Sequence, residues 1–198
     1  PERPMFWTIE PFADPEKVAA AQVIHHFESL LTLLGVTGLN GAFDREGRPL
    51  LNYFATEQFS SEVRSWFTKS SPSPGIDGYR IAGPRWFWVM AVELGPEVRT
   101  AEAVVCIDRT WYGYFPDGVP ERRRPPGEPG VYVLSGYTLH KEQTQDGMRW
   151  KVHLEHSVYD HHAEQYSLPC QQWVGHSWPP ETVSPTPAAS VAVTAGRS

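Results

Sequence analysis

The stretch Thr100–Tyr114 (TAEAVVCIDRTWYGY) constrains the fold most, because its composition predicts a strand that is buried on at least one face. Branched and aromatic residues dominate it, and neither Gly nor Pro interrupts it before Gly113. Side chains alternate between the two faces of a strand. The predicted faces are Val104, Cys106, Asp108, Thr110 and Tyr112 on one side, and Val105, Ile107, Arg109 and Trp111 on the other. A carboxylate, a thiol and a phenol then share one side of a central strand, and any functional site is expected near them.

Two helices are predicted before this strand. The sequence Asp14-Pro15-Glu16 is typical of a helix start, because it combines an N-cap, a proline in the first turn and an early acid. Apolar residues at helical spacing predict helices over Asp14–Leu34, ending at Gly35, and over about Pro49–Thr68.

The periodicity then changes to that of strands. The predicted strands are Tyr79–Leu94, Thr100–Tyr114, Val131–Glu142 and Met148–Tyr159, with turns at 95–97 and 143–147. In the last strand, the side chains predicted to share one face are Trp150, Val152, Leu154, His156 and Val158. Helices followed by long antiparallel strands predict an α+β fold, in which a curved sheet wraps the helices around a pocket.

The other segments are predicted to lack regular structure. Residues 1–13 are expected to form an arm that packs its aromatic side chains onto a single domain over 14–178. A long loop rich in proline and glycine is predicted over Phe115–Gly130, and an irregular segment over Asp160–Trp178. The Pro/Ser/Thr/Ala-rich end, 179–198, is predicted to be disordered and dispensable.

Length and charge narrow the function classes. The 198 residues suffice for one domain with a hydrophobic core. A net charge of −6 argues against a nucleic-acid partner, and the only basic run, Arg122–Arg124, lies between prolines in the predicted loop. No apolar run approaches the roughly 20 residues that a membrane span needs. The aromatic content of 13% suits a deep core or an aromatic-lined cavity.

The chain contains two cysteines, Cys106 and Cys170, and two interpretations of them are open. They form one disulfide if the protein is exported, or remain two buried thiols if it is not. A bridge would close a loop of about 64 residues and contribute roughly 3–4 kcal/mol on the loop-entropy model. The chain begins with Pro1 and shows no leader, so we expect a processed form whose targeting segment has been removed.

Several short motifs resemble one known family. They read Cys106-Ile107-Asp108-x-x-Trp111, then Asp146-Gly147-x-x-Trp150-Lys151-Val152, with Cys170 after the last strand. Over residues 14–170 the chain resembles exported, often lipid-anchored proteins of actinomycetes with the NTF2-like (SnoaL-like) cone fold. The resemblance implies two or three N-terminal helices packed on a curved sheet, export to the cell envelope, and a Cys106–Cys170 disulfide. The His-rich segment 153–162 and the loop 115–130 depart from that family's pattern.

Asp108 is the sharpest candidate for chemistry. Enzymes of the NTF2-like class use an Asp or His in the cone as a general base, and an apolar pocket raises the pKa of a carboxyl. Tyr112 could donate to an oxyanion, and His156 could pair with Asp108. The alternative is a structural carboxylate bound to a helix end or an arginine. The predicted pocket comprises Tyr53, Trp86, Trp88, Asp108, Tyr112 and Trp150.

Other groups of residues are weaker candidates for a metal site or a catalytic site. The residues His153, His156, Asp160, His161, His162 and Glu164 are dense enough to suggest a metal, but their spacing matches no known site. Cys106 lacks the local signature of a nucleophile. Neither a metal nor a cofactor is therefore predicted.

Two functions are carried forward from the sequence. The first is a non-catalytic exported domain that binds a small apolar ligand or a partner protein at the cell envelope. The second is an enzyme of the cyclase, isomerase or hydrolase type, with acid/base chemistry at Asp108 and His156 and no cofactor.

Overall fold

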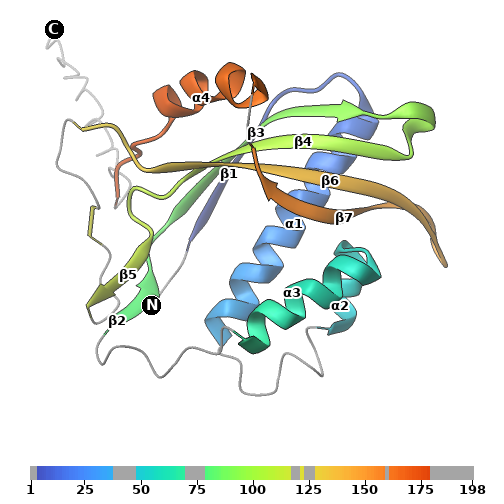
Figure 1. The fold of residues 1–198 in the computed structure, drawn as a ribbon, viewed down its shortest axis with the longest axis horizontal. Coiled ribbons are helices and arrows are strands. Elements are labelled where there is room, and N and C mark those ends of the chain that lie inside the picture. Colours follow the sequence, from blue (N-terminus) through green and yellow to red (C-terminus); the bar gives the residue numbers. More distant parts are fainter. Residues whose placement is uncertain are drawn as a thin grey trace, which may run out of the picture.

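The computed structural model describes residues 4–37, 48–69, 79–116, 121–122, 128–158 and 161–178. Its fold is α+β (Figure 1), as predicted. The predicted tail from Pro179 and residues 117–120 and 123–127 of the predicted loop lie outside the described residues.

A curled five-stranded sheet forms the centre of the molecule, in the order β1-β3-β4-β6-β7. The strands are β1 (Met5–Ile9), β3 (Arg85–Leu94), β4 (Thr100–Asp108), β6 (Tyr132–Thr144) and β7 (Gly147–Ser157). β1 pairs with β3 in parallel, and the other neighbours are antiparallel. Bulges between Val89 and Ala91 and between Thr138 and Leu139 interrupt the register, and bulges of this kind bend a sheet. A separate two-stranded sheet pairs β2 (Tyr79–Ala82) with β5 (Gly113–Pro116).

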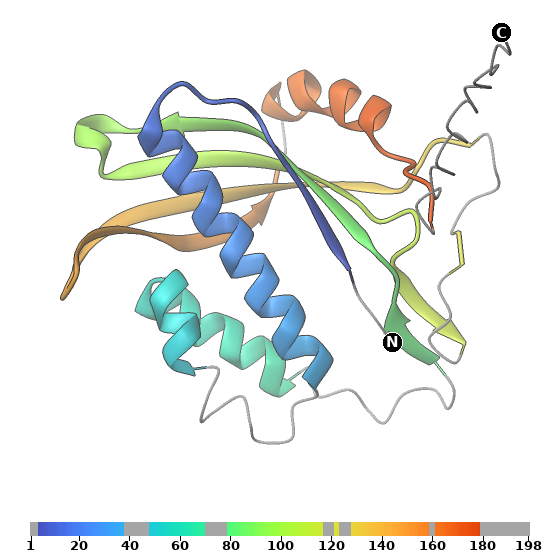
Figure 2. The same cartoon turned by 180° about the vertical axis from the view of Figure 1, so that it is seen from behind.

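Helices cover the two faces of the large sheet unequally (Figures 1 and 2). α1 (Pro15–Thr37), α2 (Arg48–Phe54) and α3 (Glu57–Lys69) lie on one face, which we call the inner face. α4 (His161–Trp173) lies on the opposite, outer face. A short 3-10 helix, η2 (Pro96–Val98), joins β3 to β4.

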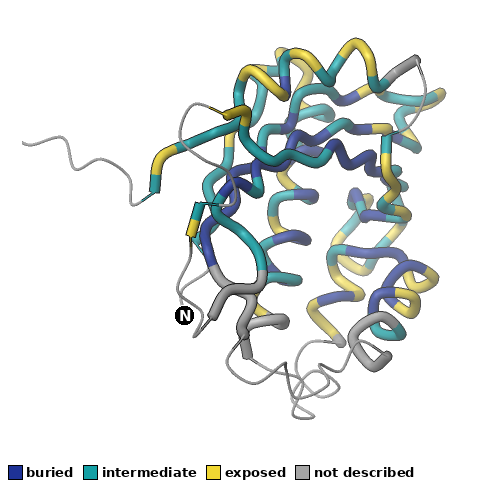
Figure 3. Tube along the Cα trace, turned by 60° about the vertical axis from the view of Figure 1, so that its left-hand side comes forward, coloured by how far each residue is buried: buried dark blue, intermediate teal, exposed yellow. Residues whose placement is uncertain are grey.

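The core divides between the same two faces (Figure 3). The larger part of the apolar core lies on the inner face, where Val105 and Ile107 of β4 pack with Phe27 of α1 and Phe59 of α3. The outer cluster centres on Cys106, Leu134 and Cys170. The alternation predicted for β4 is therefore observed from Val104 to Asp108.

Two long predicted strands are interrupted in the structure. β4 ends at Asp108, and residues 109–112 form a turn in which the Tyr112 N–H donates to the Arg109 carbonyl at 3.1 Å. Tyr79–Leu94 is likewise divided into β2 and β3 at Gly83, whose φ of +97° is open to few residues other than glycine. The prediction that Tyr112 shares a strand face with Asp108 is wrong for this reason.

The second predicted helix is also divided, into α2 and α3. Ala55 bridges Val152 of β7, and the Thr56 N–H donates to the Val152 carbonyl at 2.9 Å. The Thr56 hydroxyl accepts from the Phe59 N–H at 3.4 Å and so caps the new helix. Tertiary pairing with β7 thus overrides the helical periodicity.

Both ends of the domain are more regular than predicted. Residues 5–9 form the edge strand β1 instead of an irregular arm, although Phe6 and Trp7 do pack onto the domain. Residues 161–173, predicted to be irregular, form α4 in spite of Pro169. Tyr166, Cys170 and Trp173 recur at helical spacing and face the outer side of the sheet.

The bulge near His153 reverses the facing of β7. Trp150 and Val152 face the inner core as predicted. Beyond the bulge, Leu154 lies opposite Thr138 and Glu155 opposite the buried Tyr137. The prediction that Leu154 and His156 share a face with Trp150 is therefore wrong, because one extra residue exchanges the two faces.

Candidate functional site

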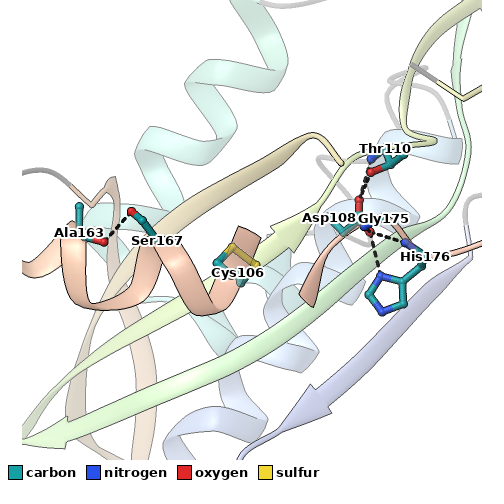
Figure 4. Close-up of a disulfide and its surroundings, with 8 residues drawn as sticks. Cys106, Asp108, Thr110, Ala163, Ser167, Gly175 and His176 are labelled. Carbon is teal, nitrogen blue, oxygen red and sulfur yellow. Dashed lines mark hydrogen bonds and ion pairs between the residues drawn. A yellow bond between two sulfur atoms is a disulfide. The ribbon is translucent and has the colours of Figure 1, made fainter. Parts of the chain in front are cut away.

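Asp108 lies at the end of β4 on the outer face, where hydrogen-bond donors surround its carboxylate (Figure 4). Thr110 donates to Oδ1 from its backbone N–H at 2.8 Å and from its hydroxyl at 2.6 Å. Oδ2 accepts from the N–H of Gly175 at 2.8 Å and of His176 at 3.1 Å. The His176 ring nitrogen Nδ1 lies 2.8 Å from the same oxygen. Asp108 is fully buried, so all of its acceptor positions are used within the fold.

The electrostatics of Asp108 fit a structural carboxylate. Burial raises its pKa, but the hydrogen bonds from His176 and Thr110 outweigh burial and hold the pKa below its ordinary value. The group is then ionised at neutral pH, and its lone pairs are occupied. It is poorly suited to take a proton from a substrate. What it does is tie residues 175–176, just beyond α4, to the end of β4.

A disulfide makes the second attachment of α4. Cys106 of β4 and Cys170 of α4 are bonded, with their Cα atoms 5.6 Å apart, and both residues are fully buried. The predicted disulfide is therefore confirmed. Because Cys106 and Asp108 are neighbours on the outer face, one strand holds α4 and the segment after it (Figure 4).

The predicted acid/base partners do not meet at Asp108. His156 is exposed on the outer face, and its ring lies against Gly136. Gly136 is in register with Val104, four residues along β4 from Asp108. Tyr112 lies beyond the strand, with its ring 4.7 Å from the guanidinium carbon of Arg85.

The predicted pocket residues are divided between the two faces. Trp86 stacks between Phe6 and His176 on the outer face, and Trp88 lies near Trp173 of α4. Trp150 belongs to the inner core.

The polar contacts of the remaining predicted side chains confirm this division. The Trp150 indole N–H donates to Glu16 of α1 at 2.8 Å. Tyr53 of α2 is 46% exposed, and the Arg149 guanidinium carbon lies 3.6 Å from its ring centroid. The six residues therefore do not line one site.

A different group of polar side chains converges on the inner face. We call it the inner cluster, and it comprises Glu28, Arg85, Arg109, Tyr112, Ser135, Tyr137 and Glu155. The Tyr137 hydroxyl donates to Glu28 Oε1 at 2.9 Å, and Arg85 Nη1 lies 3.8 Å from Glu28 Oε2. Arg85 Nη2 also donates to the Thr32 hydroxyl of α1. Glu28, Arg85 and Tyr137 are all buried, and they come from α1, β3 and β6.

β7 and the turn after β4 complete the inner cluster. The Ser135 hydroxyl donates to Glu155 Oε1 at 3.2 Å. Arg109 has its guanidinium carbon 6.0 Å from the Tyr112 ring, which Arg85 also contacts. Two guanidinium groups therefore lie near one phenol ring, and one of them, that of Arg85, also pairs with Glu28.

Burial controls the protonation of the inner cluster. Burial, reinforced by the negative charge of Glu155, raises the pKa of Glu28 to about 7 in spite of Arg85 and Tyr137. Burial likewise raises the pKa of Glu155 and of Tyr137. The negative charge of Glu155 thus disfavours the ionised form of Glu28, and burial disfavours the ionised form of both carboxyl groups.

Two nitrogen atoms of the inner cluster lack hydrogen-bond acceptors. Among the residues that the structure describes, the buried side-chain polar atoms without a partner are Trp7 Nε1, Arg85 Nε and Arg109 Nε. A buried donor without an acceptor costs about 1–3 kcal/mol, so each such atom in a native fold calls for an explanation. Two of these three atoms, Arg85 Nε and Arg109 Nε, belong to the inner cluster.

The sequence holds a signal for the inner cluster in two charged residues that stand among apolar ones. Glu28 interrupts the apolar stripe of α1 one turn after Ile24, and Ile24 is fully buried. Arg85 opens a strand in which the next residues are Trp and Phe. A charge within a buried stripe marks a paired or functional group. The convergence of these charges, however, depends on how the elements pack.

The histidine-rich segment does not assemble a metal centre in the described part of the chain, where no group of three or more His, Cys, Asp or Glu side chains is placed to hold an ion. The His153 ring stacks on His140 at 3.9 Å, and its Nδ1 lies 3.2 Å from the Thr56 hydroxyl. His156 Nε2 lies 3.9 Å from Glu102. Asp160 and the side chains of His161 and His162 lie outside the described residues.

One cleft opens on the outer side, between α4 and the chain before β6. Its volume is about 560 Å³, and its lining residues include Arg122, Glu128, Leu168 and Gln171. It lies apart from the inner cluster, and none of the predicted site residues lines it.

Comparisons with known proteins assign no family. No family model matches the chain, and no curated protein matches it. Among solved structures, the chain is similar to the intermembrane space region of the chloroplast protein ARC6, with a TM-score of 0.41 and 10% sequence identity. That match covers 76% of this chain and all of the other. Within the described residues, no helix is both long and apolar enough to cross a membrane.

Proposed function

We propose that this chain is an exported domain of the NTF2-like type that binds a small, largely apolar ligand against the inner face of its sheet. The observation that carries the proposal is the pair of buried arginine Nε atoms without acceptors at the inner cluster. Rigid scaffolds tolerate unsatisfied polar groups chiefly at functional positions. The curled sheet with three helices on its inner face is compatible with a cone.

Support for export comes from the disulfide. Cys106 and Cys170 pair within a buried apolar cluster, and structural disulfides persist in oxidising compartments. The disulfide to α4 and the hydrogen bonds of Asp108 to the segment after α4 suit a domain whose outer face serves stability. We therefore assign the proposed binding site to the inner face.

The test is a titration of the isotope-labelled full chain with 1-octanol, followed by backbone amide chemical shifts. An uncharged amphiphile tests for small-ligand binding without assuming the charge of the natural ligand. We expect the shifts to concentrate on α1, β3, β6 and β7 around the inner cluster. Shifts confined to the cleft beside α4, or none at all, would contradict the proposal and favour a partner protein as the ligand.

A second candidate function is favoured by one specific observation, the protonation of Glu28. A carboxyl group with a pKa of about 7 beside the Tyr137 hydroxyl has the properties of a general acid or base. Under this alternative Glu28 takes the role that the sequence suggested for Asp108. Deuterium exchange into cyclohexanone in D2O tests it, because an enolisable ketone needs only a base and a donor. Exchange that is catalysed by the parent and lost in Glu28→Gln would support an enzyme, and exchange equal to that of buffer would reject this chemistry.

A further inference from the structure

A ligand that binds at the inner cluster can supply an acceptor for Arg85 Nε and Arg109 Nε, and this requirement defines its chemistry. The inference rests on the proposed function. We propose that the ligand presents a carboxylate to Arg85 and Arg109 at the inner cluster, and that a proton from solvent enters the cluster with it. The proton goes to a carboxylate of the Glu28–Glu155 pair, and no covalent bond to the ligand forms or breaks.

The positions of the two guanidinium groups support an anionic acceptor. The side chain of Arg85 is 10% exposed, and its terminal nitrogens are engaged by Glu28 and Thr32 while its Nε is not. Arg109 also buries an unpaired Nε. Both groups lie near the Tyr112 ring, with guanidinium carbons 4.7 Å (Arg85) and 6.0 Å (Arg109) from its centroid. Arginine binds carboxylates through charge-assisted hydrogen bonds that combine Nε and a terminal nitrogen.

The charge balance of the inner cluster also supports an anionic ligand group. The ionisable groups that face Glu28 are Arg85 from β3, Arg109 from the turn after β4, Tyr137 from β6 and Glu155 from β7. Two permanent positive charges therefore act on two carboxyl groups, of which Glu28 has a pKa of about 7. When Glu28 is protonated, the cluster carries excess positive charge, which a bound carboxylate neutralises.

A cationic ligand fits the same residues less well. Glu28 already accepts from Tyr137 and pairs with Arg85, and Glu155 already accepts from Ser135. The atoms that lack partners at the cluster are donors. An ammonium group would bring further donors and leave both Nε atoms unsatisfied.

The experiment compares octanoate with 1-octanol by calorimetry on the full chain, at pH 6 and pH 8. These probes share an alkyl chain and differ in the carboxylate. We expect octanoate to bind at least tenfold more tightly than 1-octanol at pH 6. Its dissociation constant should rise about tenfold by pH 8, because the protonated fraction of a group with a pKa near 7 falls about tenfold. Repeating the pH 7 titration in buffers of different ionisation enthalpy should reveal net proton uptake.

Three variants separate the effect of the Arg109 charge from the effect of the Glu28 proton on octanoate binding. Arg109→Met should weaken octanoate binding tenfold or more, and should weaken 1-octanol binding by a much smaller factor. Arg99→Met is the matched control, because Arg99 is exposed and pairs only with the exposed Glu97 among the ion pairs of the described residues. Glu28→Gln should abolish the proton uptake and flatten the pH dependence of octanoate binding, since it mimics the protonated acid.

The outcomes distinguish this inference from the proposed function. Equal affinities for octanoate and 1-octanol, or octanoate binding without proton uptake in the parent, would overturn the inference and leave a neutral-ligand domain. Inorganic phosphate binding as tightly as octanoate would overturn the assignment of a carboxylate. Failure of both amphiphiles to bind would overturn the proposed function and the inference together.

Discussion

Asp108 fits two roles when only the sequence is known, and its contacts in the structure distinguish between them. In the sequence it is an acid on a buried strand, which suits either a catalytic base or a structural anchor. In the structure its two oxygens accept from Thr110, Gly175 and His176. The second interpretation is the one that this geometry supports.

Replacing Asp108 with asparagine should therefore destabilise the fold. The change keeps the size of the side chain but removes charge-assisted bonds, so we expect a loss of about 1–3 kcal/mol at pH 7. The lowered pKa means that the ionised form stabilises the native state above the unfolded pKa of about 4, and that this contribution disappears as the pH falls through the lower folded value. Chemical denaturation at pH 7 and pH 3 measures the difference between parent and variant, which should shrink at pH 3. The exposed Glu62→Gln in α3 is the control and should change little, whereas an Asp108→Asn variant as stable as the parent would favour a desolvated base.

At the scale of elements, α4 depends on its two attachments to β4. Its helical spacing was hidden by Pro169 and by the histidines before it, and the disulfide explains why the segment nevertheless docks. In β4 and β7 the predicted alternation of side chains between the two faces also ends early. A turn after Asp108 ends it in β4, and a bulge at His153 ends it in β7.

Removal of the disulfide should cost the domain much of its stability. For Cys106→Ala/Cys170→Ala we expect a loss of roughly 3–4 kcal/mol, because the bridge shortens the unfolded chain by closing a long loop. Urea denaturation of parent and double variant gives the difference. In the parent, thiol titration of the denatured, unreduced protein should find no free thiol, and two reactive thiols would contradict the bridge.

Gly83 is expected to be the least replaceable glycine among the connections that the structure describes. A Cβ there would lie 1.8 Å from the Trp111 carbonyl oxygen, and backbone cannot move aside as a side chain can. Gly83→Ala should cost more than about 2 kcal/mol, because it adds this clash to the strain of a positive φ. Gly147→Ala is the matched control, since Gly147 has a φ of +111° but no atom within 4 Å of its Cβ position, and should cost only about 1 kcal/mol. Thermal denaturation of the two variants compares them, and equal losses would contradict the clash.

For the whole molecule, the inner cluster makes the stability of the fold depend on pH, because its members come from α1, β3, β6, β7 and the turn after β4. No single element contains a pair of its carboxyl groups. Its protonation is thus a property of the assembled fold.

The pH dependence of stability should reveal Glu28. Its folded pKa of about 7 exceeds its unfolded value, so the native state binds more protons and stability falls as the pH rises from about 4.5 to about 7. The fall should reach roughly 3 kcal/mol at most, and Glu28→Gln should lack this component. Denaturation of both proteins at pH 5 and pH 8 tests this, with Glu62→Gln as the control. Parallel pH profiles for the parent and Glu28→Gln would contradict the raised pKa.

The sequence by itself determined the class of the fold, the start of the first helix, the hairpin of β6 and β7, and the pairing of Cys106 with Cys170 that its family resemblance implies; the predicted stop at Gly35 is wrong, because α1 continues to Thr37. These features depend on local periodicity, capping and turn chemistry, or on short motifs. Only the tertiary structure decided that Thr56 divides a helix, that a bulge exchanges the faces of β7, and that residues 161–173 form a helix. It also decided which charges meet, because Glu28, Arg85, Tyr137 and Glu155 are far apart in the chain and converge only when the curled sheet packs against α1.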